Sequence, residues 1–173
     1  MTGRAGRPLN ADDALWFTEE NVGQLGRITV DGSITEHPLD PGSFPTGIAA
    51  DASGKVWFTE ELSNVIGRIN ANKPNAFGTL KRFPVPTDGA LPWDITLRPD
   101  GNMWFTELAG RNIGRITPKG RIKEFRVPGE SGMAGIHRRS GREHLVLRGV
   151  RGLHRTHHPE LTATSAAPRA GTG

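Results

Sequence analysis

The sequence predicts an all-β protein made of repeated sheets, and two observations indicate this class. The 173 residues include 23 glycines and 13 prolines, and turn signals separate short strand candidates along most of the chain. The string WFTE occurs three times, with tryptophans at Trp16, Trp57 and Trp104 that are 41 and 47 residues apart. Self-similarity at such a period is typical of repeat architectures.

Each repeat contains four short strand candidates separated by Gly, Asn, Asp and Pro. In the middle repeat they cover residues 47–51, 56–60, 66–70 and 80–85, and the insertion NANKPNAFGTLKR lengthens the second interval. Four strands in about 40–45 residues are typical of a β-propeller blade. We therefore expect an irregular leader at residues 1–11 and about three four-stranded blades in residues 12–136, the first blade lacking its opening strand.

Residues that recur in every repeat are expected to be scaffold, because function depends on local departures from a fold. The Trp and Phe of WFTE are expected to pack between neighbouring blades. Each WFTE glutamate is followed eight residues later by an arginine, which predicts cross-strand ion pairs rather than catalytic carboxylates. The recurring set is Trp16, Trp57, Trp104, Phe17, Phe58, Phe105, Glu19, Glu60, Glu107, Arg27, Arg68 and Arg115.

Composition narrows the possible functions. The absence of cysteine excludes disulfides and thiolate metal sites, and the absence of a long apolar run predicts a cytoplasmic protein without a membrane span. The net charge of +4 is unevenly placed, because residues 1–136 carry a net −1 and residues 137–173 a net +5. The repeats therefore offer no electrostatic footprint for nucleic acid.

The strings WFTE and IGRI, followed by EF and a late proline, resemble the virginiamycin B lyase (streptogramin B lyase) family over about residues 12–136. The resemblance implies a seven-bladed propeller, monomeric when complete, that opens a cyclic depsipeptide antibiotic at its ester bond by elimination and so gives antibiotic resistance. It also implies a histidine base and a magnesium ion. A base that removes a proton and a cation that stabilises the developing negative charge are suited to this chemistry.

The resemblance implies that the catalytic histidines stand in a P-H-x-I string near the start of the late blades, which lie downstream of this chain. The matching positions here hold Thr46, Trp93 and Ala134, so we expect no catalytic residue and no metal site in this chain. His37 is expected to be solvated on an outer strand. Trp93 and Asp94 depart from the repeat and are candidates to face a ligand, although they are equally explained as a local change in blade packing.

Residues 137–173 change character and become rich in Arg and His. Read one base further on, their possible codons permit a WF-x-E string with its tryptophan at position 145, 41 residues after Trp104, and then IGRITP from position 154. The sequence thus predicts a fourth blade translated out of frame, ending in a basic, disordered tail. A nucleic-acid arm would lack interleaved aromatic residues, and HRTHH would chelate a metal only weakly.

Two functions from different classes remain open. One is a streptogramin B lyase-like protein that is truncated and inactive as written. The other is a propeller that binds a ligand or a protein without chemistry. Three blades cannot close a ring, so an open arc would leave apolar faces and strand edges unpaired.

Overall fold

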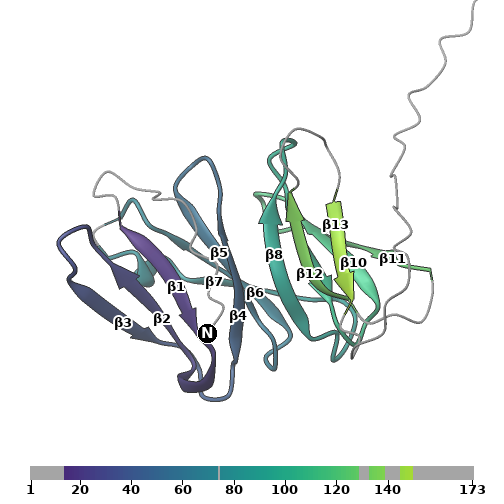
Figure 1. Cartoon of the computed structure of the whole chain (residues 1–173), viewed down its shortest axis with the longest axis horizontal. Helices are drawn as coiled ribbons and strands as arrows, with labels where there is room; N and C mark the ends of the chain where they lie inside the picture. Colours follow the sequence, from purple (N-terminus) through teal and green to yellow (C-terminus); the bar gives the residue numbers. More distant parts are fainter. Residues whose placement is uncertain (1–13, 74, 129–132, 139–144, 150–173) are drawn as a thin grey trace, which may run out of the picture.

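The structure, a computed structural model, describes residues 14–73, 75–128, 133–138 and 145–149. These residues form consecutive antiparallel sheets (Figure 1). The strands are β1 (Leu15–Glu19), β2 (Gln24–Ile28), β3 (Ile34–Pro38), β4 (Pro45–Ala50), β5 (Lys55–Glu60), β6 (Val65–Asn70), β7 (Lys81–Pro84), β8 (Pro92–Leu97), β9 (Met103–Glu107), β10 (Asn112–Ile116), β11 (Ile122–Arg126), β12 (Met133–Arg138) and β13 (Leu145–Gly149), with 3-10 turns η1 (Glu20–Val22) and η2 (Phe77–Thr79).

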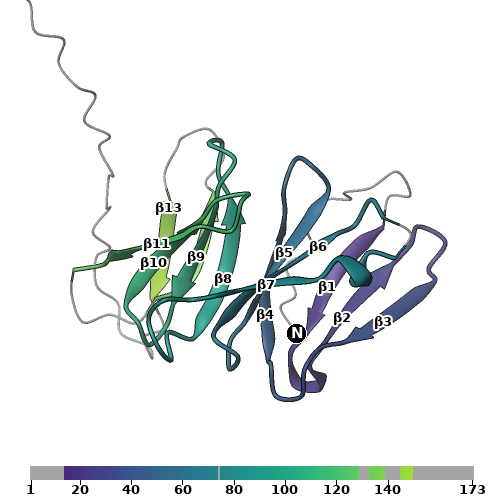
Figure 2. The same ribbon diagram turned by 180° about the vertical axis from the view of Figure 1, so that it is seen from behind.

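The sheets follow the predicted repeat. Strands β4–β7 and β8–β11 make two four-stranded sheets in simple up-and-down order, and β1–β3 make a three-stranded sheet. The first strands of successive sheets are neighbours, since β1 contacts β4, β4 contacts β8, and β8 contacts β12. Figures 1 and 2 show the sheets side by side, which is the arrangement of propeller blades. The all-β, partial-propeller prediction is confirmed.

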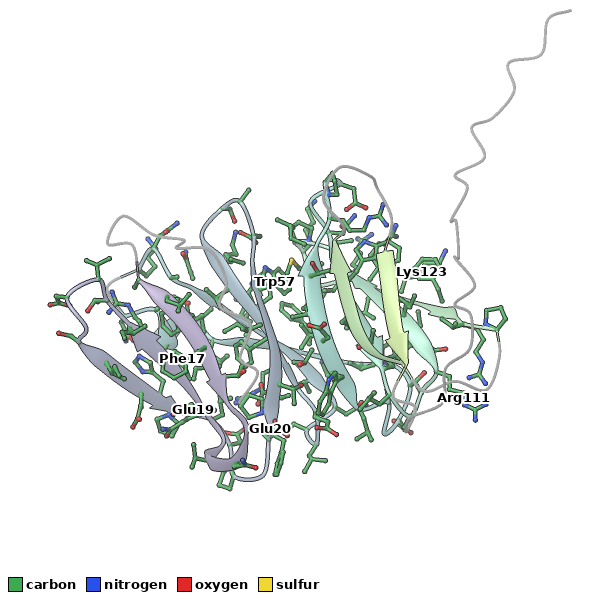
Figure 3. All side chains as sticks on the ribbon, in the orientation of Figure 1. Phe17, Glu19, Glu20, Trp57, Arg111 and Lys123 are labelled. Atoms are coloured by element: carbon green, nitrogen blue, oxygen red, sulfur yellow. The ribbon has the colours of Figure 1, made fainter. Side chains whose placement is uncertain are left out.

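The core lies between the sheets rather than within one of them. Trp16 and Leu25 of the first sheet pack with Val56, Phe58 and Ile69 of the second. Trp57 packs in turn with Ile95, Met103, Phe105 and Ile116 of the third sheet, and Figure 3 shows it between these two sheets. Each blade therefore needs its neighbour to bury its apolar face.

Two glycines show why the repeated strings contain glycine at fixed positions. Gly67 of IGRI lies opposite Phe58 in the register of β5 and β6, and a Cβ at Gly67 would overlap the Phe58 ring. Gly101, in the turn between β8 and β9, has a φ of 76°, which a residue with a side chain rarely adopts. The glycine of IGRI therefore leaves room for the Phe ring of WFTE, whereas Gly101 allows the turn.

The predicted Glu–Arg ion pairs are wrong, because the paired positions lie on opposite faces of each sheet. Arg68 lies opposite Trp57 in the register of β5 and β6. Glu60 lies three residues after Trp57 in β5, and because successive side chains of a strand alternate between faces, Glu60 and Arg68 point to opposite faces of the sheet. The Arg68 guanidinium lies 4.8 Å from the centre of the Trp57 ring. The first and third repeats follow the same register, Arg27 opposite Trp16 and Arg115 opposite Trp104.

Beyond Ile136, strand pairing continues into the segment expected to be disordered. β12 pairs with β13, and His137 lies opposite Val146. In the third sheet, Thr96 occupies the position equivalent to His137 and lies opposite Trp104, eight residues later in the chain. The same separation would place the partner of His137 at position 145, one residue before Val146. Leader residues 1–11 and tail residues 139–144 and 150–173 lie outside the described residues. Within the described ranges, no helix is long and apolar enough to cross a bilayer.

Candidate functional site

The positions that match the family histidines lie in a bulge near the start of each first strand. The pairing register shifts between Pro45 and Ile48 in β4, between Pro92 and Ile95 in β8, and between Met133 and Gly135 in β12. Thr46, Trp93 and Ala134 therefore occupy the same bulge in three successive sheets. Bulges are frequent beside active sites because they redirect side chains.

A short hydrogen-bond network holds the first two of these bulges together. The Thr59 hydroxyl, from WFTE of the second sheet, donates to the Trp93 carbonyl oxygen of the third sheet over 2.7 Å. The Thr46 hydroxyl lies 2.7 Å from the same oxygen and 2.8 Å from the Thr59 hydroxyl. The backbone N–H of Gly47 donates to Thr59 Oγ1 over 2.8 Å. We call the bond from a WFTE threonine to the next sheet's bulge a threonine tie.

The threonine tie recurs in the first sheet, where the Thr18 hydroxyl donates to the Thr46 carbonyl oxygen over 2.8 Å. In the third sheet the Thr106 hydroxyl accepts the backbone N–H of Asp94 over 3.2 Å, as Thr59 does from Gly47. Thr59 thus joins the bulge of its own sheet to that of the next, whereas Thr18 bonds to the next sheet's bulge and Thr106 to its own. Sequence reasoning assigned WFTE to scaffold but did not single out this hydroxyl.

The two candidate ligand-facing residues, Trp93 and Asp94, are half-buried in the β8 bulge. Trp93 contributes its backbone carbonyl to the threonine tie, and the Asp94 carboxylate accepts the backbone N–H of Ile95 over 2.9 Å. These bonds explain the backbone positions of both residues. Their role toward a ligand stays a prediction.

The WFTE glutamates of the second and third sheets are buried, but they have different partners. Glu60 forms an ion pair with Arg82 of β7, 2.7 Å from Arg82 Nε to Glu60 Oε1. The position of Arg82 is taken in the third sheet by Glu124, since Arg82 is in register with Gly67 and Glu124 with Gly114. Among the described residues, no arginine pairs with Glu107, which instead accepts a hydrogen bond from Asn112 Nδ2 over 2.8 Å.

This exchange changes the acidity of Glu107. Burial raises the pKa of Glu107 to about 7, and the negative charge of Glu124 adds to the rise, whereas the Asn112 hydrogen bond lowers it. Within the part of the chain that the structure describes, Glu107 Oε1 is buried and has no hydrogen-bond partner. Glu124 accepts hydrogen bonds from the backbone N–H and the hydroxyl of Thr87. Near neutral pH Glu107 therefore exists in comparable amounts of the protonated and the ionised form.

The residues that the structure describes do not fit the magnesium ion implied by the family resemblance. No group of three His, Cys, Asp or Glu side chains gathers among them in a way that could hold a metal. Glu107 and Glu124 come near each other, but the other close partners are the Asn112 amide and Thr87.

His37, which was expected to be solvated, is half-buried. Its ring is stacked between Trp16, at 5.8 Å between ring centres, and Phe77 of η2, at 4.7 Å. Burial lowers the pKa of His37, and the positive charge of Arg27 lowers it further. His37 borders a cavity of about 250 Å³ between the first sheet and the segment after β6. Alignment of the repeats could have found it, because His37 stands where the other repeats have Phe83 and Phe125.

The stacked sheets, with first strands adjacent and WFTE packed between them, define the chain as part of a β-propeller. The sequence profile of the Virginiamycin B lyase family matches residues 4–140, and the chain belongs to this family. No curated protein sequence matches the chain significantly.

Solved structures agree with this assignment. Selenomethionine-substituted virginiamycin B lyase from Staphylococcus aureus is 33% identical with a TM-score of 0.73, over 86% of this chain and 49% of that chain. A catalytically inactive histidine-to-alanine variant of that lyase, solved with quinupristin, is 38% identical with a TM-score of 0.72, over 80% and 46% of the two chains. A streptogramin B lyase is 35% identical with a TM-score of 0.67, over 74% and 42%.

This chain spans about half the length of those lyase structures. A gluconolactonase from Xanthomonas campestris shares only the fold, at 19% identity and a TM-score of 0.60 over 76% of this chain and 48% of that chain.

Proposed function

We propose that this chain supplies blades of a lyase that opens cyclic streptogramin B antibiotics at their ester bond. Family membership and the relative solved with quinupristin support this substrate class. In the elimination, a base removes a proton from carbon, a carbon–carbon double bond forms, and the ester oxygen leaves as a carboxylate. No water is added, so the linear product has the same mass as the cyclic substrate.

We further propose that this chain does not perform the reaction alone. The observation that carries this proposal is the content of the three bulges, where Thr46, Trp93 and Ala134 stand in place of the family histidines. Neither a threonine hydroxyl nor an indole can serve as a general base near neutral pH. The described residues thus act as scaffold, and the base and any magnesium ion belong to blades that this chain does not contain.

A direct assay tests this proposal. The purified chain is incubated with quinupristin and magnesium chloride, and a linear isomer of unchanged mass is sought by chromatography and mass spectrometry. Far-ultraviolet circular dichroism on the same sample reports whether the strands are formed. We expect folded protein without product.

The sequence becomes rich in Arg and His after Ile136. We propose that the residues from His137 onward are a fourth blade read out of frame. It is supported by the repeat spacing of the strings that the shifted frame permits. Sequencing the gene across the codons for Ile136 and His137 tests it. One base fewer restores WF-x-E and IGRITP strings, whereas an unchanged sequence in independent isolates contradicts the idea of a simple insertion.

A propeller that binds without chemistry is the second candidate. It is favoured by the same bulges, which retain the threonine ties while lacking the histidines. Saturable quenching of tryptophan fluorescence by quinupristin, without any linear product, is the result that distinguishes this function from catalysis.

A further inference from the structure

The interface between the first and second sheets departs from the repeat in two ways, and both departures meet at one place. In the first sheet His37 replaces the phenylalanine that the other sheets carry at Phe83 and Phe125. Each of those phenylalanines stacks on its own tryptophan, as His37 does on Trp16. A histidine preserves this stack and adds polar ring nitrogens at its edge.

The second departure is the insertion after β6. Between the second and third sheets, the short turn after β10 fills the matching region, because Arg68 Nη1 donates to the Pro118 carbonyl over 2.7 Å and Gly120 packs against Phe83. Between the first and second sheets the longer segment takes the place of that turn. It stacks Phe77 on His37 and leaves a cavity of about 250 Å³ (Figure 2 shows this segment between β6 and β7 near the first sheet).

The polar lining of this cavity consists mainly of hydrogen-bond donors. Arg27, Thr35 and His37 contribute from the first sheet, and Lys73 and Asn75 contribute from the inserted segment. Trp16 forms an aromatic wall. No Asp or Glu from the described ranges lines the cavity. A space with two cationic side chains and an imidazole edge is suited to a small oxyanion, which accepts hydrogen bonds and carries negative charge.

We propose that this cavity, called here the His37 cavity, binds a small ligand through a carboxylate or phosphate group. Arg27 and Lys73 supply positive charge from opposite walls, and the edge of the His37 ring donates a hydrogen bond between them. The two rings that cover the faces of His37 fix its orientation, so only its edge is available. The site is independent of the proposed lyase function, because its residues come from the first sheet and the segment after β6 rather than from the bulges.

Nuclear magnetic resonance of the full chain tests the site. Inorganic phosphate, acetate and, as a control, chloride are titrated at constant ionic strength. We expect saturable shifts of the His37 ring signals and of the amides of Ala71, Lys73, Asn75 and Ala76 with phosphate, acetate or both, and none with chloride. Because an oxyanion stabilises the imidazolium beside Arg27 and Lys73, bound ligand also raises the pKa of His37. A response to phosphate alone assigns a phosphate ligand, and a response to acetate alone a carboxylate ligand.

Matched variants make the test specific. Lys73→Met is expected to raise the dissociation constant for the oxyanion about tenfold or more, because a charge-assisted hydrogen bond is lost. Lys119→Met removes an exposed turn lysine from the third sheet and leaves affinity within about twofold. His37→Phe restores the stack of the other sheets, so it keeps the fold and weakens binding about threefold to tenfold.

Equal shifts with chloride, or unchanged affinity in Lys73→Met, would overturn the proposal. Lys73 is exposed, so its variant is expected to fold, and the dispersion of the amide spectrum verifies this. If the signals of Lys73→Met collapse, Lys73→Gln, which keeps a polar head without charge, decides by the same criterion.

Discussion

The hydroxyl of Thr59 and the carbonyl oxygen of Trp93, 2.7 Å apart, join two successive blades at the bulge in the first strand of the third sheet. The same hydroxyl accepts the Gly47 N–H of its own blade. One side chain therefore fixes the position of two bulges. A residue that takes part in this network is scaffold even though it lies beside the functional position.

Replacement of Thr59 by valine is expected to lower the free energy of unfolding by about 2–3 kcal/mol. Valine keeps the shape but leaves the Gly47 N–H and the Trp93 carbonyl without their buried partner. Denaturant unfolding measures the change. Thr59→Ser, which retains the hydroxyl, is the control and is expected to lose less than half as much; equal losses in the two variants would refute the role of the hydroxyl.

The free energy of unfolding is expected to fall as pH rises from about 4.5 to about 7, by up to about 3 kcal/mol from Glu107. The raised pKa keeps Glu107 protonated in the folded chain while the unfolded chain releases the proton, so the unfolded state gains stability over that interval. Denaturant midpoints measured across it report the slope. Glu107→Gln mimics the protonated acid and is expected to flatten this part of the profile; an unchanged slope would contradict the assignment.

Glu60 is expected to couple to Arg82 and not to Arg68. A double-mutant cycle with Glu60→Gln and Arg82→Met should give a coupling of about 1–3 kcal/mol, because the pair joins a buried carboxylate to a guanidinium. The cycle with Arg68→Met should give about zero, since Arg68 lies on the opposite face over Trp57. A larger coupling to Arg68 would restore the ion pair that the sequence predicted.

Gly67→Ala is expected to destabilise the chain by about 1–3 kcal/mol, because the added methyl group would overlap the Phe58 ring. Gly89→Ala is a useful contrast: a Cβ there meets no other group, although its φ of 58° adds some strain. Thermal or denaturant unfolding of both variants tests the close approach. A smaller loss at Gly67 than at Gly89 would argue against it.

The repeat was readable from the sequence because identical strings at fixed spacing must occupy equivalent places in successive blades. The strands of the second sheet, the missing first strand of the first sheet in the described range, and the packing of Trp57 between sheets all followed from it. The Glu–Arg pairing failed because a spacing of eight does not fix the register. One residue of shift in a hairpin exchanges the faces of a sheet.

The His37 cavity was missed for a different reason. A histidine on an outer strand is ordinarily solvated, but Phe77 of the next blade's insertion stacks on His37 and covers part of it. Such a contact joins residues 40 positions apart, so local pattern alone does not reveal it. The exchange of Arg82 for Glu124 was visible in the aligned repeats. Its effect on Glu107 depends on the register of the sheet, which places Glu107, Asn112 and Glu124 on the same face.

The central claim is that these blades belong to a streptogramin B lyase fold whose base is not among Thr46, Trp93 and Ala134. The measurement that tests it most directly is the incubation of folded chain with quinupristin and magnesium, followed by mass spectrometry of the products. We expect intact cyclic antibiotic at every time point. Magnesium-dependent formation of a linear isomer of the same mass would contradict it, because the base would then have to lie in this chain.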